Sequence, residues 1–186
     1  MKKFELTNEF ITNMFGTKLF RIRALVEFGD VEAGELGGYV EKESNLGHDD
    51  NAWVYGDARV YDNALVCGNA RVYDNARVYG DAWVYGNARV CGDALVCGDA
   101  RVCGNGDYAY AHGFGSVNRT TTFFRLKDGG VGVRCGCFYG TLAQFRDKIR
   151  ETHGESAIAE EYLDLAALME KRFRRTGNEQ KTEEES

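Results

Sequence analysis

Residues 51–104 read NAWVYG DARVYD NALVCG NARVYD NARVYG DAWVYG NARVCG DALVCG DARVCG, which is nine hexapeptides without an insertion. Each unit has alanine at its second position and valine at its fourth, and units meet at a pair drawn from glycine, aspartate and asparagine. Alternation of inward and variable residues over four positions indicates a short strand with one buried face. Glycine, asparagine and aspartate tolerate positive φ, so each pair predicts a corner. The stretch therefore predicts short arms joined by turns, with alanine and valine inside.

The spacing from each valine to an alanine four residues later, as from Val54 to Ala58, resembles the hexapeptide-repeat family. That resemblance implies a left-handed parallel β-helix with triangular coils. The coils would be residues 51–68, 69–86 and 87–104. An imperfect earlier coil is expected to begin near Gly37, so we predict a mainly β fold with about three to four stacked coils.

The segments outside the repeat predict caps for the open ends of the coil stack. Before the repeat, alternating apolar residues at 17–26 predict a strand that forms a hairpin with the first residues of the chain. After it, residues 120–126 and 131–140 predict a second hairpin. The expected domains are an N-terminal β cap (1–36), the β-helix (37–107), a C-terminal cap (108–175) and a disordered acidic tail (176–186).

Two helices complete the predicted C-terminal α+β cap. Thr141 and Gln144 have the spacing of a capping box, and Gly154 is placed to end the helix that follows. A second helix is expected from about Ser156 to Arg172, where apolar residues recur at helical spacing.

The residues that point outward from the coils are rich in tyrosine, tryptophan and arginine, which are enriched at the centres of protein interfaces. So much aromatic surface argues against a monomer, and the hexapeptide-repeat resemblance implies a homotrimer. Part of this surface could instead line ligand clefts between subunits. The residues expected at the oligomer interface are Leu65, Tyr73, Tyr79, Trp83 and Tyr85.

Composition excludes several classes of protein. The net charge is −6, without a basic stripe or a dense row of carboxylates, which argues against binding or mimicry of nucleic acid. Neither a secretory signal nor an apolar run long enough to span a membrane is present, so we expect a cytoplasmic protein of a bacterial host. The six cysteines are expected to stay as thiols, because those on successive arms point in different directions.

Catalytic and metal-binding patterns are weak. His48 or His112 could act as the general base of a hexapeptide-repeat acyltransferase, but the coil stack is short for coenzyme A and neither histidine has a carboxylate placed to orient it. Cys135 and Cys137 form one Cys-x-Cys without the second pair that a zinc site needs. We therefore predict no catalytic residue, no metal and no cofactor.

The stretch GFGSVNRTTT at 113–122 is the strongest candidate for ligand binding outside the repeat. A glycine-rich backbone with hydroxyl groups and an arginine can hold an anion, and neighbouring aromatic rings can stack on a base. The stretch lacks the Walker pattern, and it could equally be a connector that satisfies its own backbone. The predicted ligand-binding residues are Tyr110, His112, Phe114, Asn118, Arg119, Thr120, Thr121 and Arg134.

The whole chain also resembles a group of phage- and prophage-encoded hexapeptide-repeat proteins, through FGDVEAGELGGYVEKESNL at 28–46, the repeats, and TTTFFRLKDG at 120–129. That resemblance implies a phage setting. The first functional hypothesis is a non-enzymatic homotrimer that sequesters a small anionic, nucleotide-like host defence signal. The alternatives are an inhibitor or assembly protein that binds a host protein, and an acyltransferase.

Overall fold

The computed structural model describes residues 2–184, with side chains up to Thr176. Contacts divide the chain into two compact units, residues 1–105 and 106–186. The first unit contains the N-terminal hairpin and the coils, and the second contains the C-terminal sheet and helices. The predicted cap and β-helix at 1–107 thus lie in the first unit except for residues 106 and 107, and the bounds of the four predicted domains stay predictions.

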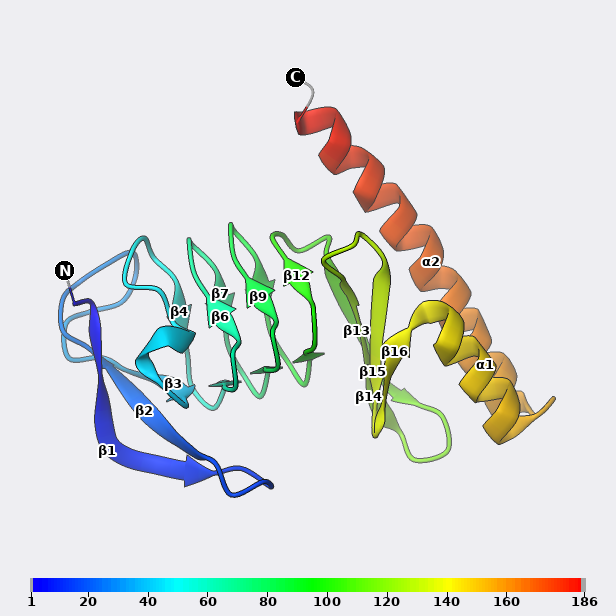
Figure 1. The fold of residues 1–186 in the computed structure, drawn as a ribbon, viewed down its shortest axis with the longest axis horizontal. Helices are drawn as coiled ribbons and strands as arrows, with labels where there is room; N and C mark the ends of the chain where they lie inside the picture. Colours follow the sequence, from blue (N-terminus) through cyan, green and yellow to red (C-terminus); the bar gives the residue numbers. More distant parts are fainter. Residues whose placement is uncertain (1, 185–186) are drawn as a thin grey trace. The chain divides into compact units, whose positions relative to one another are not determined.

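Each hexapeptide forms one two-residue strand, and the coils stack in the first unit (Figure 1). The strands are β4 (Trp53–Val54), β5 (Arg59–Val60), β6 (Leu65–Val66), β7 (Arg71–Val72), β8 (Arg77–Val78), β9 (Trp83–Val84), β10 (Arg89–Val90), β11 (Leu95–Val96) and β12 (Arg101–Val102). The alanines and valines of all nine units are buried, as the repeat predicts.

The coils form three parallel sheets, because each strand pairs with the strand three repeats later. We name the sheets by one outward residue each: the Trp53 face (β4, β7, β10), the Tyr61 face (β3, β5, β8, β11) and the Trp83 face (β6, β9, β12). In β3 (Leu36–Val40), Val40 pairs with Val60, and Leu46 bridges to Val66. The solenoid therefore has about four turns, and the coil expected near Gly37 is present.

Corners of the coils are stabilised by side chains as well as by glycine. Asp62 and Asp74 have φ values of 56° and 58°, in the left-handed region that aspartate tolerates better than most residues. Their carboxylates accept hydrogen bonds from the backbone N–H groups of Gly80 (3.1 Å) and Gly92 (3.0 Å) in the next coil. The Gly/Asp/Asn pairs thus form corners, as predicted, and also join one coil to the next.

The expected N-terminal hairpin is present, and it extends the Tyr61 face. Strands β1 (Phe4–Thr12) and β2 (Lys18–Ala24) are antiparallel, and β2 pairs with β3. A short 3₁₀ helix, η1 (Glu43–Asn45), follows β3, and its buried Asn45 donates to the carbonyl of Ala64 at 2.8 Å.

The N-terminal segment also covers the start of the Trp53 face. Trp53 points outward from its strand, as its position in the repeat predicts, but it is 0% exposed. The rings of Phe4 and Phe28 pack edge-on against it, with centroids 6.2 and 5.3 Å away. Beside it, the Lys3 amine donates to the carbonyl of Ala52 at 2.9 Å, and burial lowers the pKa of Lys3 to about 8. Trp53 is therefore part of the core.

The second unit begins with a four-stranded antiparallel sheet instead of the predicted two-stranded hairpin. Its strands are β13 (Tyr108–Phe114), β14 (Arg119–Arg125), β15 (Val131–Cys135) and β16 (Phe138–Thr141). The segment 131–140, predicted as one strand, is divided because Gly136 turns the chain with φ of 57°. The segment 108–114, for which the sequence predicted no strand, is β13.

Two helices cover one face of this sheet. In α1 (Leu142–His153), the predicted capping box is formed: Thr141 Oγ1 accepts from Gln144 N–H at 3.3 Å, and Gln144 accepts from Thr141 N–H at 2.8 Å. Helix α2 runs Ala157–Glu184 and so continues past the predicted end at Arg172. It occupies most of the segment predicted as a disordered tail, whose last residues, 185–186, lie outside the described part of the chain.

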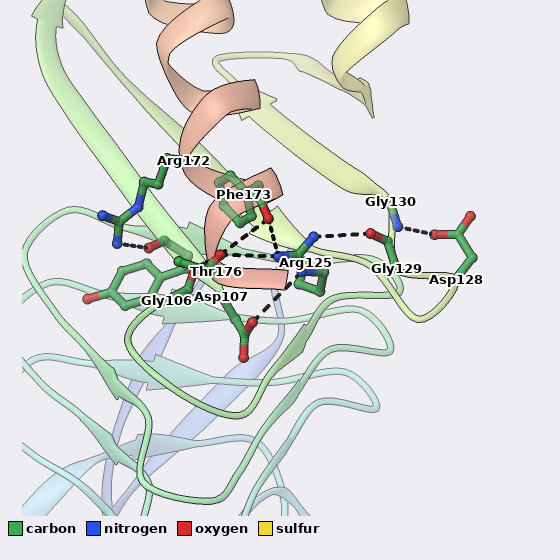
Figure 2. Close-up of polar contacts among 10 residues, drawn as sticks. Gly106, Asp107, Arg125, Asp128, Gly129, Gly130, Arg172, Phe173 and Thr176 are labelled. Carbon is green, nitrogen blue, oxygen red and sulfur yellow. Dashed lines mark hydrogen bonds and ion pairs between the residues drawn. The ribbon is translucent and has the colours of Figure 1, made fainter. Parts of the chain in front are cut away.

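Arg125, at the end of β14, ties the sheet to α2 (Figure 2). Its guanidinium donates to the carbonyls of Phe173 (2.8 Å) and Gly129 (3.2 Å) and to the Thr176 hydroxyl (3.2 Å). Asp107, whose side chain is 3% exposed, lies 3.8 Å from the guanidinium. One partly buried cation thus contacts four acceptors from three segments of this unit.

Candidate functional site

The C-terminal sheet divides the predicted ligand-binding residues between its two faces. Tyr110 pairs with Thr122 and Thr122 with Arg134, whereas Ala111 pairs with Thr121 and Thr121 with Cys135. Successive side chains of a strand point to opposite faces, so Tyr110 and Arg134 share one face and Thr121 lies on the other. The predicted set therefore does not form a single site.

Tyr110, His112, Thr120 and Arg134 lie on the sheet face opposite the helices. His112 Nδ1 is 2.8 Å from the Thr120 hydroxyl. Arg134 donates weakly to the carbonyl of Cys137 at 3.4 Å, and its buried Nε has no hydrogen-bond partner. Arg134 supplies the positive charge of this group, and all four residues stay predicted ligand contacts.

The remaining predicted residues lie on the helix side or in the turn. Phe114 packs against the sheet–helix core, and Thr121 donates to the Cys135 sulfur at 3.1 Å. Arg119 lies against the Gly136 turn. Asn118 has φ of 50° and belongs to the turn from β13 to β14.

The glycine-rich turn at 115–118 already binds an anionic group of the chain itself. The backbone N–H of Gly115 donates to the carboxylate of Glu161 in α2 at 2.8 Å. A ligand anion at this amide would have to displace that carboxylate. The turn thus behaves as the connector that the sequence left open as the alternative.

The predicted interface residues are spread over all three faces of the solenoid. Leu65, Trp83 and Tyr85 belong to the Trp83 face, Tyr73 to the Trp53 face and Tyr79 to the Tyr61 face. Tyr79 stacks on Tyr61 with ring centroids 5.0 Å apart, in a cluster with Leu19 of the N-terminal hairpin. A single flat interface could therefore include only the three residues of the Trp83 face.

A pocket of about 330 Å³ lies on the Trp53 face, beyond the part that the N-terminal segment covers. Its lining residues are Asp30, Tyr55, Arg71, Tyr73 and Arg89. Arg71 and Arg89 are paired in register on adjacent strands, so the two guanidinium groups start from backbones about 4.8 Å apart. The volume is within the lower range of small-molecule sites.

The charges in this pocket are unequal. Asp30 binds Arg71 through both carboxylate oxygens, at 2.7 and 2.8 Å. Among the described residues, the guanidinium of Arg89 has no hydrogen bond or ion pair, and this residue is exposed. Two arginines therefore face one carboxylate, and the lining carries an excess positive charge.

Both tyrosines of the pocket stay neutral at physiological pH. Burial raises the pKa of Tyr55 to about 12, and its hydroxyl donates to Asp30 at 3.2 Å. A hydrogen bond with Cys91 raises the pKa of Tyr73, with burial as the next cause. The pocket thus offers phenol groups and aromatic ring surface beside two cations, a combination suited to a small anion with a flat body.

His48 is poorly placed for acyl transfer. His48 Nε2 is 2.9 Å from the Glu43 carboxylate, a partner that the sequence did not reveal. Its Nδ1 accepts from the backbone N–H of Lys3 at 3.2 Å, and its ring stacks on Phe4. Both ring nitrogens are thus occupied, so His48 is not available as a general base.

Among residues 2–176, whose side chains the structure describes, no cluster of three or more histidine, cysteine, aspartate or glutamate side chains is placed to hold a metal ion. None of the described helices has both the length and the hydropathy to cross a membrane. No disulfide joins any of the six cysteines.

The sequence alone did not predict the pocket, although the repeat placed two of its residues side by side. The repeat places Arg71 above Arg89 on one face, and this register follows from the period alone. Asp30 comes from a loop 41 residues before Arg71, outside the repeat. Only the tertiary structure shows that its carboxylate neutralises one arginine and leaves the other unpaired.

Comparison with known proteins concerns the repeat. A family model described as the YdcK beta solenoid repeat matches residues 52–68, 70–86, 83–98 and 88–104. No curated protein matches the sequence significantly. The matched segments coincide with strands β4 to β12, and the pocket arginines lie within them. Residues 52–68 and 70–104 of this chain are therefore similar to the YdcK beta solenoid repeat, and this part of the chain folds as a β-solenoid.

Proposed function

We propose that this chain is a non-enzymatic binding protein that captures a small anionic ligand in the pocket of the Trp53 face. The observation that carries the proposal is the exposed Arg89 guanidinium, which lacks an anionic partner beside the paired Arg71. Neutral tyrosines supply hydrogen-bond donors and ring surface without adding charge. This site replaces the glycine-rich turn as the preferred location, because Glu161 occupies that turn.

Arg89→Ala should weaken the binding of a small aromatic anion such as benzenesulfonate. A hydrogen bond to a charged group contributes about 1.5–3 kcal/mol, so the affinity should fall by about ten- to hundredfold. Titration calorimetry at low salt measures this loss, with circular dichroism to confirm that the fold is kept.

Arg77→Ala is the matched control, since Arg77 is also an exposed arginine of the repeat but lies on the Tyr61 face. It should leave the affinity unchanged. Equal affinities in wild type and in Arg89→Ala would refute the pocket as the anion site.

The second part of the proposal is assembly into a homotrimer through the Trp83 face. Trp83 is 45% exposed, and the Arg101 guanidinium stacks on its ring at 4.7 Å. A large aromatic residue with a neighbouring arginine is typical of interface centres. Residues Tyr73 and Tyr79 are left out of this interface, because they lie on other faces.

Trp83→Ala should shift the trimer towards monomers. Loss of an interface hot spot costs about 2–4 kcal/mol per contact, which sedimentation at several protein concentrations would detect. Phe15→Ala, at the exposed tip of the N-terminal hairpin, should leave the assembly unchanged. A wild-type monomer, or a Trp83→Ala trimer of undiminished stability, would contradict the proposed interface.

The narrower proposal is that the ligand is a nucleotide-like signal of host defence, captured during phage infection. The positively charged, aromatic pocket supports an anionic ligand with a flat ring, and the phage setting comes from sequence resemblance. Native mass spectrometry of protein from infected and uninfected cells, followed by identification of the released molecules, would test it. A host protein recovered in stoichiometric amount in place of a small molecule would favour the alternative of a protein-binding inhibitor.

A further inference from the structure

Asp30 is held over the pocket by a tight turn. The backbone groups of Phe28 and Val31 exchange hydrogen bonds of 3.1 and 2.9 Å, and Gly29 adopts φ of 56°. Both ends of the turn are anchored, because Phe28 packs on Trp53 and Val31 is 1% exposed. The Asp30 carboxylate is therefore a fixed part of the pocket wall.

This carboxylate neutralises one of the two cations. Both of its oxygens contact Arg71, and Tyr55 donates to one of them. Arg89 keeps its full charge, so the lining side chains sum to one positive charge. The other acidic side chains that act on the pocket tyrosines, Glu35 and Asp74, accept hydrogen bonds from backbone N–H groups and do not line the pocket.

A fixed negative charge beside a cationic pocket affects ligands according to their charge. The Coulomb energy between Asp30 and a ligand is proportional to the ligand's charge, so a dianion is repelled about twice as strongly as a monoanion. Arg89 attracts both kinds of ligand, but the single excess positive charge of the pocket neutralises a monoanion completely and a dianion only in part.

We propose that Asp30 determines specificity, so that the pocket selects ligands with a single negative charge on a flat, otherwise uncharged body. This inference rests on the proposed function, because it concerns the same pocket. Asp30 acts on the ligand through its charge, whereas Arg89 supplies the direct contact. Asp30→Asn removes the charge and keeps one oxygen that can accept from Arg71 and Tyr55.

The test compares benzenesulfonate, a monoanion, with phenyl phosphate, which is largely a dianion at pH 8 because its second pKa is about 6. The two probes share the ring and a tetrahedral anionic group. Doubling the ligand's charge doubles the Coulomb energy and therefore squares the change in affinity. If Asp30→Asn raises the affinity for benzenesulfonate about threefold, it should raise the affinity for phenyl phosphate roughly tenfold. Titration calorimetry at low salt measures both, since salt screens this effect.

Asp81→Asn is the control for net charge. Asp81 lies at the corner between β8 and β9, away from the Trp53 face, and asparagine can still accept from Asn63. It should leave the ratio of the two affinities unchanged. Equal changes for both probes in Asp30→Asn, or none, would overturn the role of Asp30 while leaving capture intact. Failure of the wild type to bind either probe would instead overturn the proposed function, and this inference with it.

Discussion

Arg125→Met is expected to destabilise the C-terminal unit by about 3–5 kcal/mol, because it removes the donor to two backbone carbonyls and a cation beside the buried carboxylate of Asp107. The Asp107 side chain is 3% exposed, and the carbonyl of Phe173 would lose its 2.8 Å hydrogen bond at the same time. Methionine fills a similar volume, so the loss would reflect charge and hydrogen bonding rather than a cavity.

The two units can be followed separately in this experiment. Helices α1 and α2 belong to the second unit, whereas both tryptophans belong to the first. Urea unfolding followed by circular dichroism at the helix band should shift, while tryptophan fluorescence reports the solenoid. Arg150→Met, which removes an exposed pair with Asp147, should cost less than about 1 kcal/mol. Similar losses in both variants would show that Arg125 does not hold this unit together.

Trp53→Ala is expected to destabilise the solenoid by about 3–5 kcal/mol, the usual cost of truncating a fully buried aromatic side chain. The cavity would open beneath Phe4 and Phe28, so the N-terminal segment would lose its aromatic contacts with Trp53. The remaining tryptophan, Trp83, reports unfolding by its fluorescence.

Phe15→Ala is the control for Trp53, since Phe15 is 79% exposed at the hairpin tip. Its cost should be within about 0.5 kcal/mol. A loss below about 1 kcal/mol in Trp53→Ala would mean that the N-terminal segment does not seal the solenoid in solution.

The repeat made most of the solenoid predictable. Valines spaced six residues apart can all be buried if the chain turns a corner after each hexapeptide, so that each hexapeptide forms one side of a coil. The parallel register of Val54, Val72 and Val90 confirms that interpretation. What the repeat could not show is which outward residues the rest of the chain covers. Trp53 and Trp83 occupy equivalent positions in their hexapeptides, yet one is 0% and the other 45% exposed.

The C-terminal unit was harder to predict, because glycines conceal its strands. Alternation of tyrosine and alanine from Tyr108 to Ala111 is a strand signal, but Gly113 and Gly115 made the stretch resemble a loop. The predicted anion site grouped residues that lie close in sequence. Neighbouring residues of a strand point to opposite faces, so the predicted ligand-binding residues are divided between the two faces of the sheet. The stronger candidate site is the pocket of the Trp53 face, where Asp30 and Arg71 meet although they are far apart in sequence.

The most direct test of the account is to observe which arginines respond to an anion. Side-chain Nε resonances of the intact protein, assigned by substitution, would be recorded during titration with benzenesulfonate. We expect Arg71 and Arg89 to shift in a saturable manner, with Arg119 and Arg134 unchanged. Saturable shifts of Arg119 and Arg134 in place of the solenoid pair, or none at millimolar probe, would contradict capture by the pocket of the Trp53 face.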